Sequence, residues 1–190
     1  MRLRAVIAAT VCVAIAACGC RRAPADVSVP RRTAYYRLQL PDTLYRPIEV
    51  DRVLLEANAD ATTQCADTGW ITISYPTLNA SIYVTVTPLT PATAAEAVDN
   101  RVERLSLNTG GQPSQVMSFT TPAGMDARVI VTDGSVPTPV QFIVTDYRRV
   151  LVSGSAVVDD AATAPVDSLA PVLQVLERDI VRLAAKMKTL

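Results

Sequence analysis

The chain of 190 residues contains no histidine, and its few aromatic residues include only one tryptophan and two phenylalanines. The lack of histidine removes the usual general base near neutral pH, the Ser-His-Asp and Cys-His catalytic arrangements, and the commonest zinc ligand. The 18 basic side chains balance the 18 acidic ones, and no basic stripe with interleaved aromatics occurs, so nothing indicates nucleic-acid binding. Carboxylate chemistry is the main catalytic route that this composition leaves open.

The N-terminus combines a positively charged start with an apolar run. Arg2 and Arg4 precede AVIAATVCVAIAA, a run of signal-peptide length that is shorter than the roughly 20 apolar residues of a membrane span. The run ends at Ile15-Ala16-Ala17-Cys18-Gly19, which resembles the bacterial lipobox. That resemblance implies cleavage before Cys18, attachment of diacylglycerol to its sulfur, and further acylation of the new amine. A plain secretory signal with an incidental cysteine is the alternative.

Removal of residues 1–17 as a lipoprotein signal peptide would leave 190 − 17 = 173 residues, enough for one domain with its own core. Residues 18–32 are polar and rich in proline and arginine, so we expect a lipidated tether there. Residues 33–190 are expected to form a single domain. Cys20 and Cys65 are the cysteines left to form a disulfide, which would persist outside the cytoplasm; two free thiols are the alternative.

Hydrophobic periodicity predicts two groups of strands and two helices. Period-two alternation predicts the first strands at Tyr35–Leu40, Ile48–Glu56, Trp70–Tyr75 and Ser81–Thr87. The second group is predicted at Gln115–Thr121, Ala127–Thr132, Val140–Thr145 and Val150–Val158. Between the groups, a helix is predicted to start near Thr90-Pro91 or, with capping-box spacing, at Thr93, and to end before Gly110. A second helix is predicted at Ser168–Met187, with Glu177, Arg178, Asp179 and Arg182 largely off its apolar stripe.

The resulting order is about four strands, a helix, about four strands and a helix. Because helices do not alternate with single strands, this ββββαββββα order favours an α+β fold over a parallel doubly wound sheet. We therefore expect an antiparallel sheet of about seven to eight strands with two packed helices. The duplicated order resembles the Mog1/PsbP-like architecture, an analogy of fold that carries no function by itself.

Trp70 has two readings that depend on what covers its side of the sheet. It alternates away from Ile71 and therefore shares a face with Thr72. If helices cover that face, Trp70 belongs to the core, which is the reading we favour. If the face is open to solvent, Trp70 is an exposed anchor for a partner, and Tyr35, Arg37 and Tyr83 would join it in a partner surface.

Residues that could suggest an enzyme have simpler explanations. Asp159 and Asp160 are neighbours that would point to opposite faces of a strand, so a solvated turn is expected there. Ser153-Gly154-Ser155 lacks the nucleophile-elbow pattern and a histidine partner. Gly110-Gly111 is followed by no lysine of a phosphate-binding loop. We therefore expect no enzyme activity, no cofactor and no metal site.

Three segments of the chain together are similar to a known family. They are Tyr35-Tyr36-Arg37-Leu38 with Leu40-Pro41, WITISYPTLNASIYVTVTP at 70–88, and VQFIVTDYRRVLVSGSAV at 140–157 with DSLAPVLQVLERDIVRL at 167–183. Joined to the lipobox, they resemble the gliding motility lipoprotein GldD family of the Bacteroidetes. The similarity extends over about 30–187, which is most of the mature chain.

This resemblance implies a lipid-anchored, non-catalytic accessory or scaffold protein of the gliding motility and type IX secretion apparatus. The protein would be anchored to the inner or outer membrane and face the periplasm. Its expected partners are the membrane and other envelope proteins of that apparatus, with no known small-molecule substrate. The alternative is a periplasmic lipoprotein that carries an apolar ligand between its sheet and its helices. A large apolar cavity would favour the alternative, whereas a filled core with an exposed aromatic patch would favour partner binding.

Overall fold

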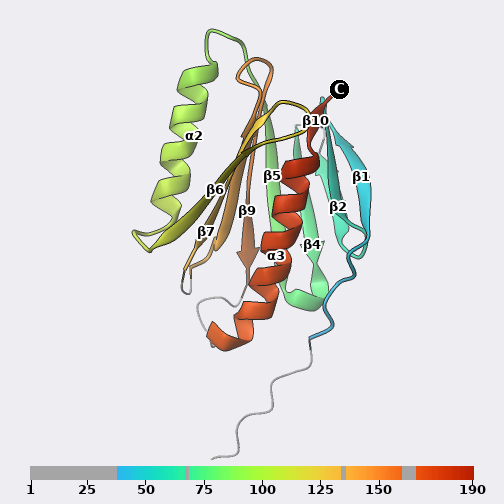
Figure 1. Cartoon of the computed structure of the whole chain (residues 1–190). Coiled ribbons are helices and arrows are strands. Elements are labelled where there is room, and N and C mark those ends of the chain that lie inside the picture. Colours follow the sequence, from blue (N-terminus) through green and yellow to red (C-terminus); the bar gives the residue numbers. More distant parts are fainter. Residues whose placement is uncertain (1–37, 67–68, 134–135, 160–165) are drawn as a thin grey trace, which may run out of the picture. The chain divides into compact units, whose positions relative to one another are not determined.

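The computed structural model describes residues 38–66, 69–133, 136–159 and 166–190 (Figure 1). These residues form a seven-stranded sheet, a three-stranded sheet and two long helices, and every strand pair is antiparallel. The α+β class and the order of strands and helices predicted from the sequence are confirmed. The division of the strands into two sheets was not predicted.

The small sheet joins the two ends of the described chain. Its strands, in the order β1-β2-β10, are β1 (Tyr45–Val50), β2 (Val53–Asn58) and β10 (Lys188–Thr189). The prediction of one strand over Ile48–Glu56 is wrong, because Asp51 and Arg52 turn the chain between β1 and β2. Asp51 has a φ of 53°, in the left-handed region that aspartate tolerates better than most residues.

The strand predicted at Tyr35–Leu40 is also wrong in the part that the structure describes. Leu38–Leu40 have no strand pairing, and Pro41, which cannot donate to a ladder, follows directly. Two further strands escaped prediction. One is β3 (Thr62–Ala66), a short, polar segment at one edge of the large sheet that lacks an apolar run. The other is β10, which has only two residues, too few for any periodicity.

The large sheet has the order β3-β4-β5-β9-β8-β7-β6, so two meanders meet where β5 pairs with β9. Its strands are β3 (Thr62–Ala66), β4 (Trp70–Tyr75), β5 (Ala80–Pro88), β6 (Ser114–Thr120), β7 (Asp126–Thr132), β8 (Val140–Thr145) and β9 (Val150–Val158). A 3-10 turn at Pro76–Leu78 links β4 to β5. The predicted strands that correspond to β4 to β9 are confirmed to within about a residue at each end.

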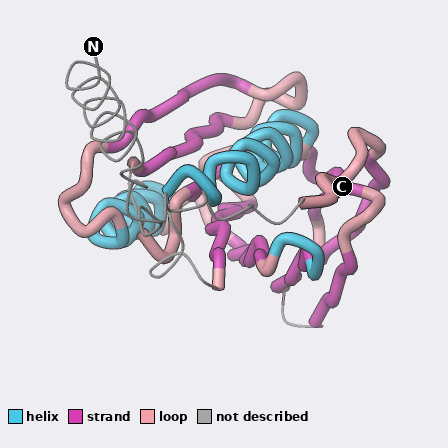
Figure 2. Tube along the Cα trace, turned by 90° about the horizontal axis from the view of Figure 1, so that it is seen from below, coloured by secondary structure: helices cyan, strands magenta, loops and turns pink. Residues whose placement is uncertain are grey.

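Helix α3 (Val166–Lys186) covers the inner face of the large sheet and contacts β2, β7 and β8. Figure 2 shows strands on both sides of α3. The main core lies here, and it is filled by fully buried side chains that include Ile71, Ile82, Phe142, Leu176, Ile180 and Leu183. The predicted helix at Ser168–Met187 is therefore confirmed, with its start two residues earlier and its end one residue earlier.

Helix α2 (Ala94–Asn108) packs on the opposite, outer face, against β8 and β9. A second apolar cluster forms there from Val98, Leu105, Ile143 and Leu151. Helix α2 starts after Thr93, the later of the two predicted sites, although the Thr93 side chain does not cap the helix. Because helices lie on both of its faces, every residue of β8 is buried.

Gln141 of β8 and Gly154 of β9 each have a role that depends on the neighbouring elements. The amide of Gln141, which is fully buried, accepts from Asn108 Nδ2 at 3.2 Å and donates to the Leu105 carbonyl at 3.3 Å, so it binds the end of α2. Gly154 lies where a Cβ would meet the Tyr83 carbonyl and come within 2.6 Å of the Phe142 ring. Glycine is therefore needed at this position for packing, and no nucleophile geometry is involved.

Candidate partner surface

The strand register places Trp70 and Tyr83 on the same face of the sheet. Trp70 pairs with Thr85 and Thr72 pairs with Tyr83, so all four side chains point away from buried Ile71 and its neighbours. Trp70 is 42% exposed and Tyr83 is 47% exposed. The prediction that Trp70 belongs to the core is wrong, because α2 covers β8 and β9 and leaves β4 uncovered.

The surface around these two aromatic side chains is polar but carries no charge. We call it the open face, defined as the outward residues of β3, β4 and β5, namely Thr62, Gln64, Trp70, Thr72, Ser74, Ser81, Tyr83 and Thr85. Each of these residues is exposed or half-buried. Ser81 donates to Ser74 across the strands at 3.2 Å. The open face thus offers two aromatic anchors among hydroxyl and amide groups, which suits a partner recognised by shape and hydrogen bonds.

The other predicted site residues are placed only in part. Tyr35 and Arg37 of the predicted partner surface lie outside the described residues, as do Cys18 and Cys20. Cys65 is exposed on β3, at the edge of the large sheet. Its pairing with Cys20 stays a prediction, and so does lipidation of Cys18.

A buried carboxylate on α3 is the most highly connected polar group that the structure describes. Asp179 is 3% exposed, so the prediction that it lies off the apolar stripe of its helix is wrong. Its Oδ1 accepts from Tyr45 Oη at 2.7 Å and Arg178 Nε at 2.9 Å, and its Oδ2 accepts from Tyr75 Oη at 2.8 Å and Asn58 Nδ2 at 3.1 Å. These donors come from β1, β2, β4 and α3 itself.

The spacing of Asp179 could have revealed its burial. It lies seven residues after Val172 and four before Leu183, both buried, so it occupies the core-facing side of α3. A lone acid among apolar residues at helical spacing signals a carboxylate that needs donors from neighbouring elements. No such signal marks the residues that donate to Asp179 from distant parts of the sequence, namely Tyr45, Asn58 and Tyr75.

The geometry around Asp179 indicates a structural role. Both carboxylate oxygens of Asp179 accept hydrogen bonds from donors. The guanidinium of Arg182 lies over the Tyr45 ring, with its Cζ atom 4.9 Å from the ring centroid. Arg182 also pairs with Glu56 of β2 at 2.7 Å. Burial, then the negative charge of Asp179 and the hydrogen bond to it, raise the pKa of Tyr75 well above its usual value. Burial and the hydrogen bond to Asp179 raise the pKa of Tyr45 as well.

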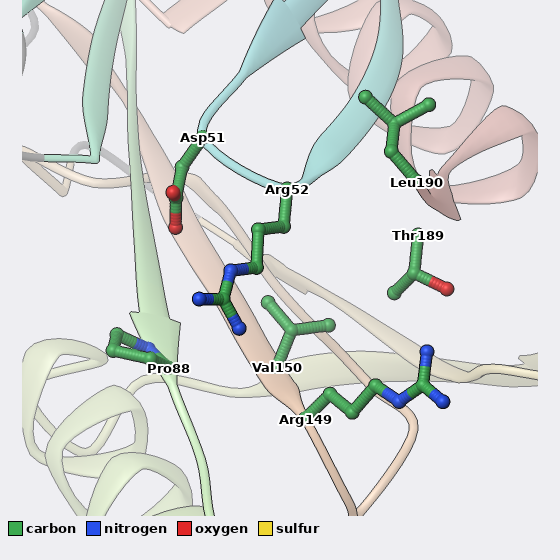
Figure 3. Close-up of a pocket in the computed structure, with 7 residues that line it drawn as sticks. All are labelled: Asp51, Arg52, Pro88, Arg149, Val150, Thr189 and Leu190. Atoms are coloured by element: carbon green, nitrogen blue, oxygen red, sulfur yellow. The ribbon is translucent and has the colours of Figure 1, made fainter.

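A pocket of about 380 Å³ lies where the β1–β2 turn, the β8–β9 hairpin and the C-terminus meet. Arg52 and Arg149 line it together with Asp51, Val150 and Thr189. Figure 3 shows the two guanidinium groups on different sides of Val150, with Arg149 extending toward Thr189. Because the arginines do not converge and both are exposed, the pocket lacks the arrangement that would hold a single anion.

The residues that the structure describes show an α+β domain with a filled core and an uncharged open face. Within the described ranges, no group of histidine, cysteine or acidic side chains is arranged to hold a metal ion. Neither described helix is long and apolar enough to cross a bilayer.

The family model for the gliding motility lipoprotein GldD matches residues 25–189, nearly the whole chain. The chain therefore belongs to the gliding motility lipoprotein GldD family, and the resemblance found in the sequence is confirmed. Membership makes it a lipoprotein, a class of membrane-anchored envelope proteins. No curated protein matches the chain.

Proposed function

We propose that this protein is a non-catalytic accessory or scaffold component of the gliding motility and type IX secretion apparatus. Acyl chains on Cys18 hold it at the inner or outer membrane, with the domain in the periplasm. The domain then presents the open face to another envelope protein of the apparatus. Membership of the gliding motility lipoprotein family supports the cellular role, and exposure of Trp70 and Tyr83 on one uncharged face is the observation that carries the mode of binding.

The packing between α3 and the sheet favours partner binding over carriage of an apolar ligand. Side chains from both layers meet there with nearly no exposure, among them Phe142, Leu176 and Ile180. An apolar ligand would need that space, since drug-sized ligands occupy cavities of about 300–1,000 Å³ lined by apolar side chains. Trp70 and Tyr83 of the open face are exposed side by side on one face, whereas Tyr147, also exposed, lies apart from them in the β8–β9 hairpin.

The partner surface is tested by affinity isolation of the membrane complex with the tagged full-length chain. The Trp70→Ala, Tyr83→Ala double variant removes both anchors, and we expect recovery of a secretion-apparatus component to fall at least tenfold, because aromatic anchors dominate interface energetics. Leu107→Ala is the matched control, since Leu107 is an apolar side chain that is 72% exposed on α2. It should recover the component like the wild type.

Two outcomes would contradict the proposal. One is a wild-type complex in which mass spectrometry identifies no component of the secretion apparatus. The other is equal recovery by the double variant and the Leu107→Ala control, which would show that binding uses another surface.

The anchor is tested separately with Cys18→Ala. Two or three acyl chains hold a protein at a bilayer where one chain holds it only marginally, so the variant should be recovered as soluble or unprocessed protein. Fractionation of wild type and variant, with mass spectrometry of the mature N-terminus, makes the comparison. Normal processing of Cys18→Ala with unchanged membrane association would show that Cys18 is not the anchor.

A further inference from the structure

Strand β6 (Ser114–Thr120) is an unprotected edge of the large sheet. It pairs with β7 on one side and has no strand on the other within the described residues. Its sequence, SQVMSFT, contains no charge and no proline, six of its seven residues are exposed, and Val116 is 59% exposed. Natural edge strands are usually short, charged, bulged or covered, because a bare edge pairs with other strands.

The opposite edge of the same sheet shows what protection looks like. Strand β3 is shorter, and Arg46 of the small sheet reaches across to it. The Arg46 guanidinium donates to the Ala61 carbonyl at 3.2 Å and to Thr63 Oγ1 at 3.0 Å. A cation therefore contacts the start of the β3 edge, whereas β6 has no such contact along its length.

The backbone hydrogen bonds of β6 define which of its groups are free. Asp133 N donates to the Pro113 carbonyl at 3.0 Å, and Thr121 N donates to the Met125 carbonyl at 2.8 Å. In an antiparallel ladder the bonded residues alternate, so odd-numbered residues of β6 bond to β7. The N–H and C=O groups that point away from β7 are those of Ser114, Val116, Ser118 and Thr120.

We propose that β6 is a homodimerisation edge, through which two copies of this chain pair antiparallel about a two-fold axis at Met117. In that register, Ser114 pairs with Thr120 of the second copy and Val116 pairs with Ser118. All outward-pointing backbone groups of β6 are then satisfied on both copies. The two seven-stranded sheets become one continuous sheet, and the two-fold axis closes the assembly at a dimer.

The side chains of β6 suit this pairing. On one face Met117, which is 37% exposed, meets Met117 of the second copy, and Phe119 lies diagonally beside it. On the other face exposed Val116 gains a neighbour. Because β6 is uncharged, no like charges stand opposite each other, whereas a charged partner strand would find no complement on it.

The small area of a single β6–β6 strand pair favours, as the partner of β6, a second copy of the chain that is held on the same membrane. One strand pair is small beside the roughly 1,200–2,000 Å² buried in stable specific complexes, so the dimer should be weak in free solution. Lipoproteins share a bilayer, and confinement raises the effective concentration of each copy for another. Dimerisation through β6 would therefore depend on the membrane.

The test is disulfide trapping with the mature acylated chain in phosphatidylcholine vesicles. Met117→Cys is made with Cys20→Ser and Cys65→Ser, which leaves one free thiol on the two-fold axis. Non-hydrogen-bonded antiparallel pairs have Cα atoms about 4.5 Å apart, within the range that a disulfide spans. The matched control keeps native Cys65, the exposed thiol on the opposite edge, with Cys20→Ser alone.

We expect the Met117→Cys protein to form a covalent dimer at least tenfold faster than the Cys65 control. Adding Ser118→Pro should reduce that rate at least tenfold, because proline removes an outward N–H and leaves the bonds to β7 intact. Adding Ser118→Ala should leave the rate unchanged. Equal rates for the two thiols, or trapping that survives Ser118→Pro in a protein whose circular dichroism is unchanged, would overturn the proposal.

Discussion

The two faces of the seven-stranded sheet differ in what covers them and in the side chains that they carry. The inner face is closed by α3, and its one acid, Asp179, is held by four donors. The open face carries hydroxyl groups, no charge and two exposed aromatic side chains. The comparison teaches that α3 packs against the inner face, whereas on the outer face α2 packs on β8 and β9 and leaves the outward side chains of β3, β4 and β5 available to a partner.

The largest effect should come from the inner face, at Asp179. Asp179→Ala removes the acceptor shared by Tyr45, Tyr75 and Asn58 and leaves buried donors without partners, so it should cost about 3–5 kcal/mol of unfolding free energy. Urea unfolding at pH 7, followed by circular dichroism, measures it. A cost under about 1 kcal/mol would mean that the inner face does not depend on this carboxylate.

A smaller effect concerns the same network at high pH. Folding raises the pKa of Tyr75, so above about pH 10 the unfolded chain loses the phenol proton first while the folded chain keeps it. The stability that Tyr75 contributes is complete below pH 10 and falls by about 1.4 kcal/mol per pH unit above it.

Tyr75→Phe removes that proton and should make the alkaline loss of stability shallower by about the same amount per pH unit. Urea unfolding of wild type and variant between pH 9 and 11 gives the two slopes. At pH 7 the variant should already be less stable by about 1–3 kcal/mol, because Asp179 loses a buried donor. Parallel slopes would contradict the placement of the Tyr75 hydroxyl.

The smallest effect on stability should come from the open face. Trp70→Ala and Tyr83→Ala each truncate a side chain that is more than two-fifths exposed, so each should change the unfolding free energy by about 0.5 kcal/mol or less. The same urea titration checks this. Losses as large as that of Asp179→Ala would show that the open face belongs to the core and would remove the contrast between the faces.

Local patterns predicted most of the elements, because each depends on contacts close in sequence. Alternation identified β4 and β5, and the apolar stripe identified α3, whose period matches one buried face. The hairpin at Asp51 was missed because its turn interrupts an apolar run with only two polar residues. Strand β3 was missed because an edge strand needs no apolar face.

The candidate site was only half predictable for the same reason. The sequence named Trp70 and Tyr83 as potential neighbours, but their exposure depends on where α2 packs, and that is decided by Leu105 and Val98 meeting Ile143 and Leu151. Three of the four donors to Asp179 come from three strands that lie more than a hundred residues before it in the chain. No local pattern reports such a meeting.

By itself, the amino-acid sequence determined the family, the α+β class, and the strands and helices with strong periodicity, since each of these depends on short stretches of residues. Only the tertiary structure decided which face of the sheet remains open, which acid is buried, and which edge strand is left bare. The physical reason is that burial, hydrogen-bond satisfaction and edge protection depend on the placement of whole elements, and those elements meet across long separations in the chain.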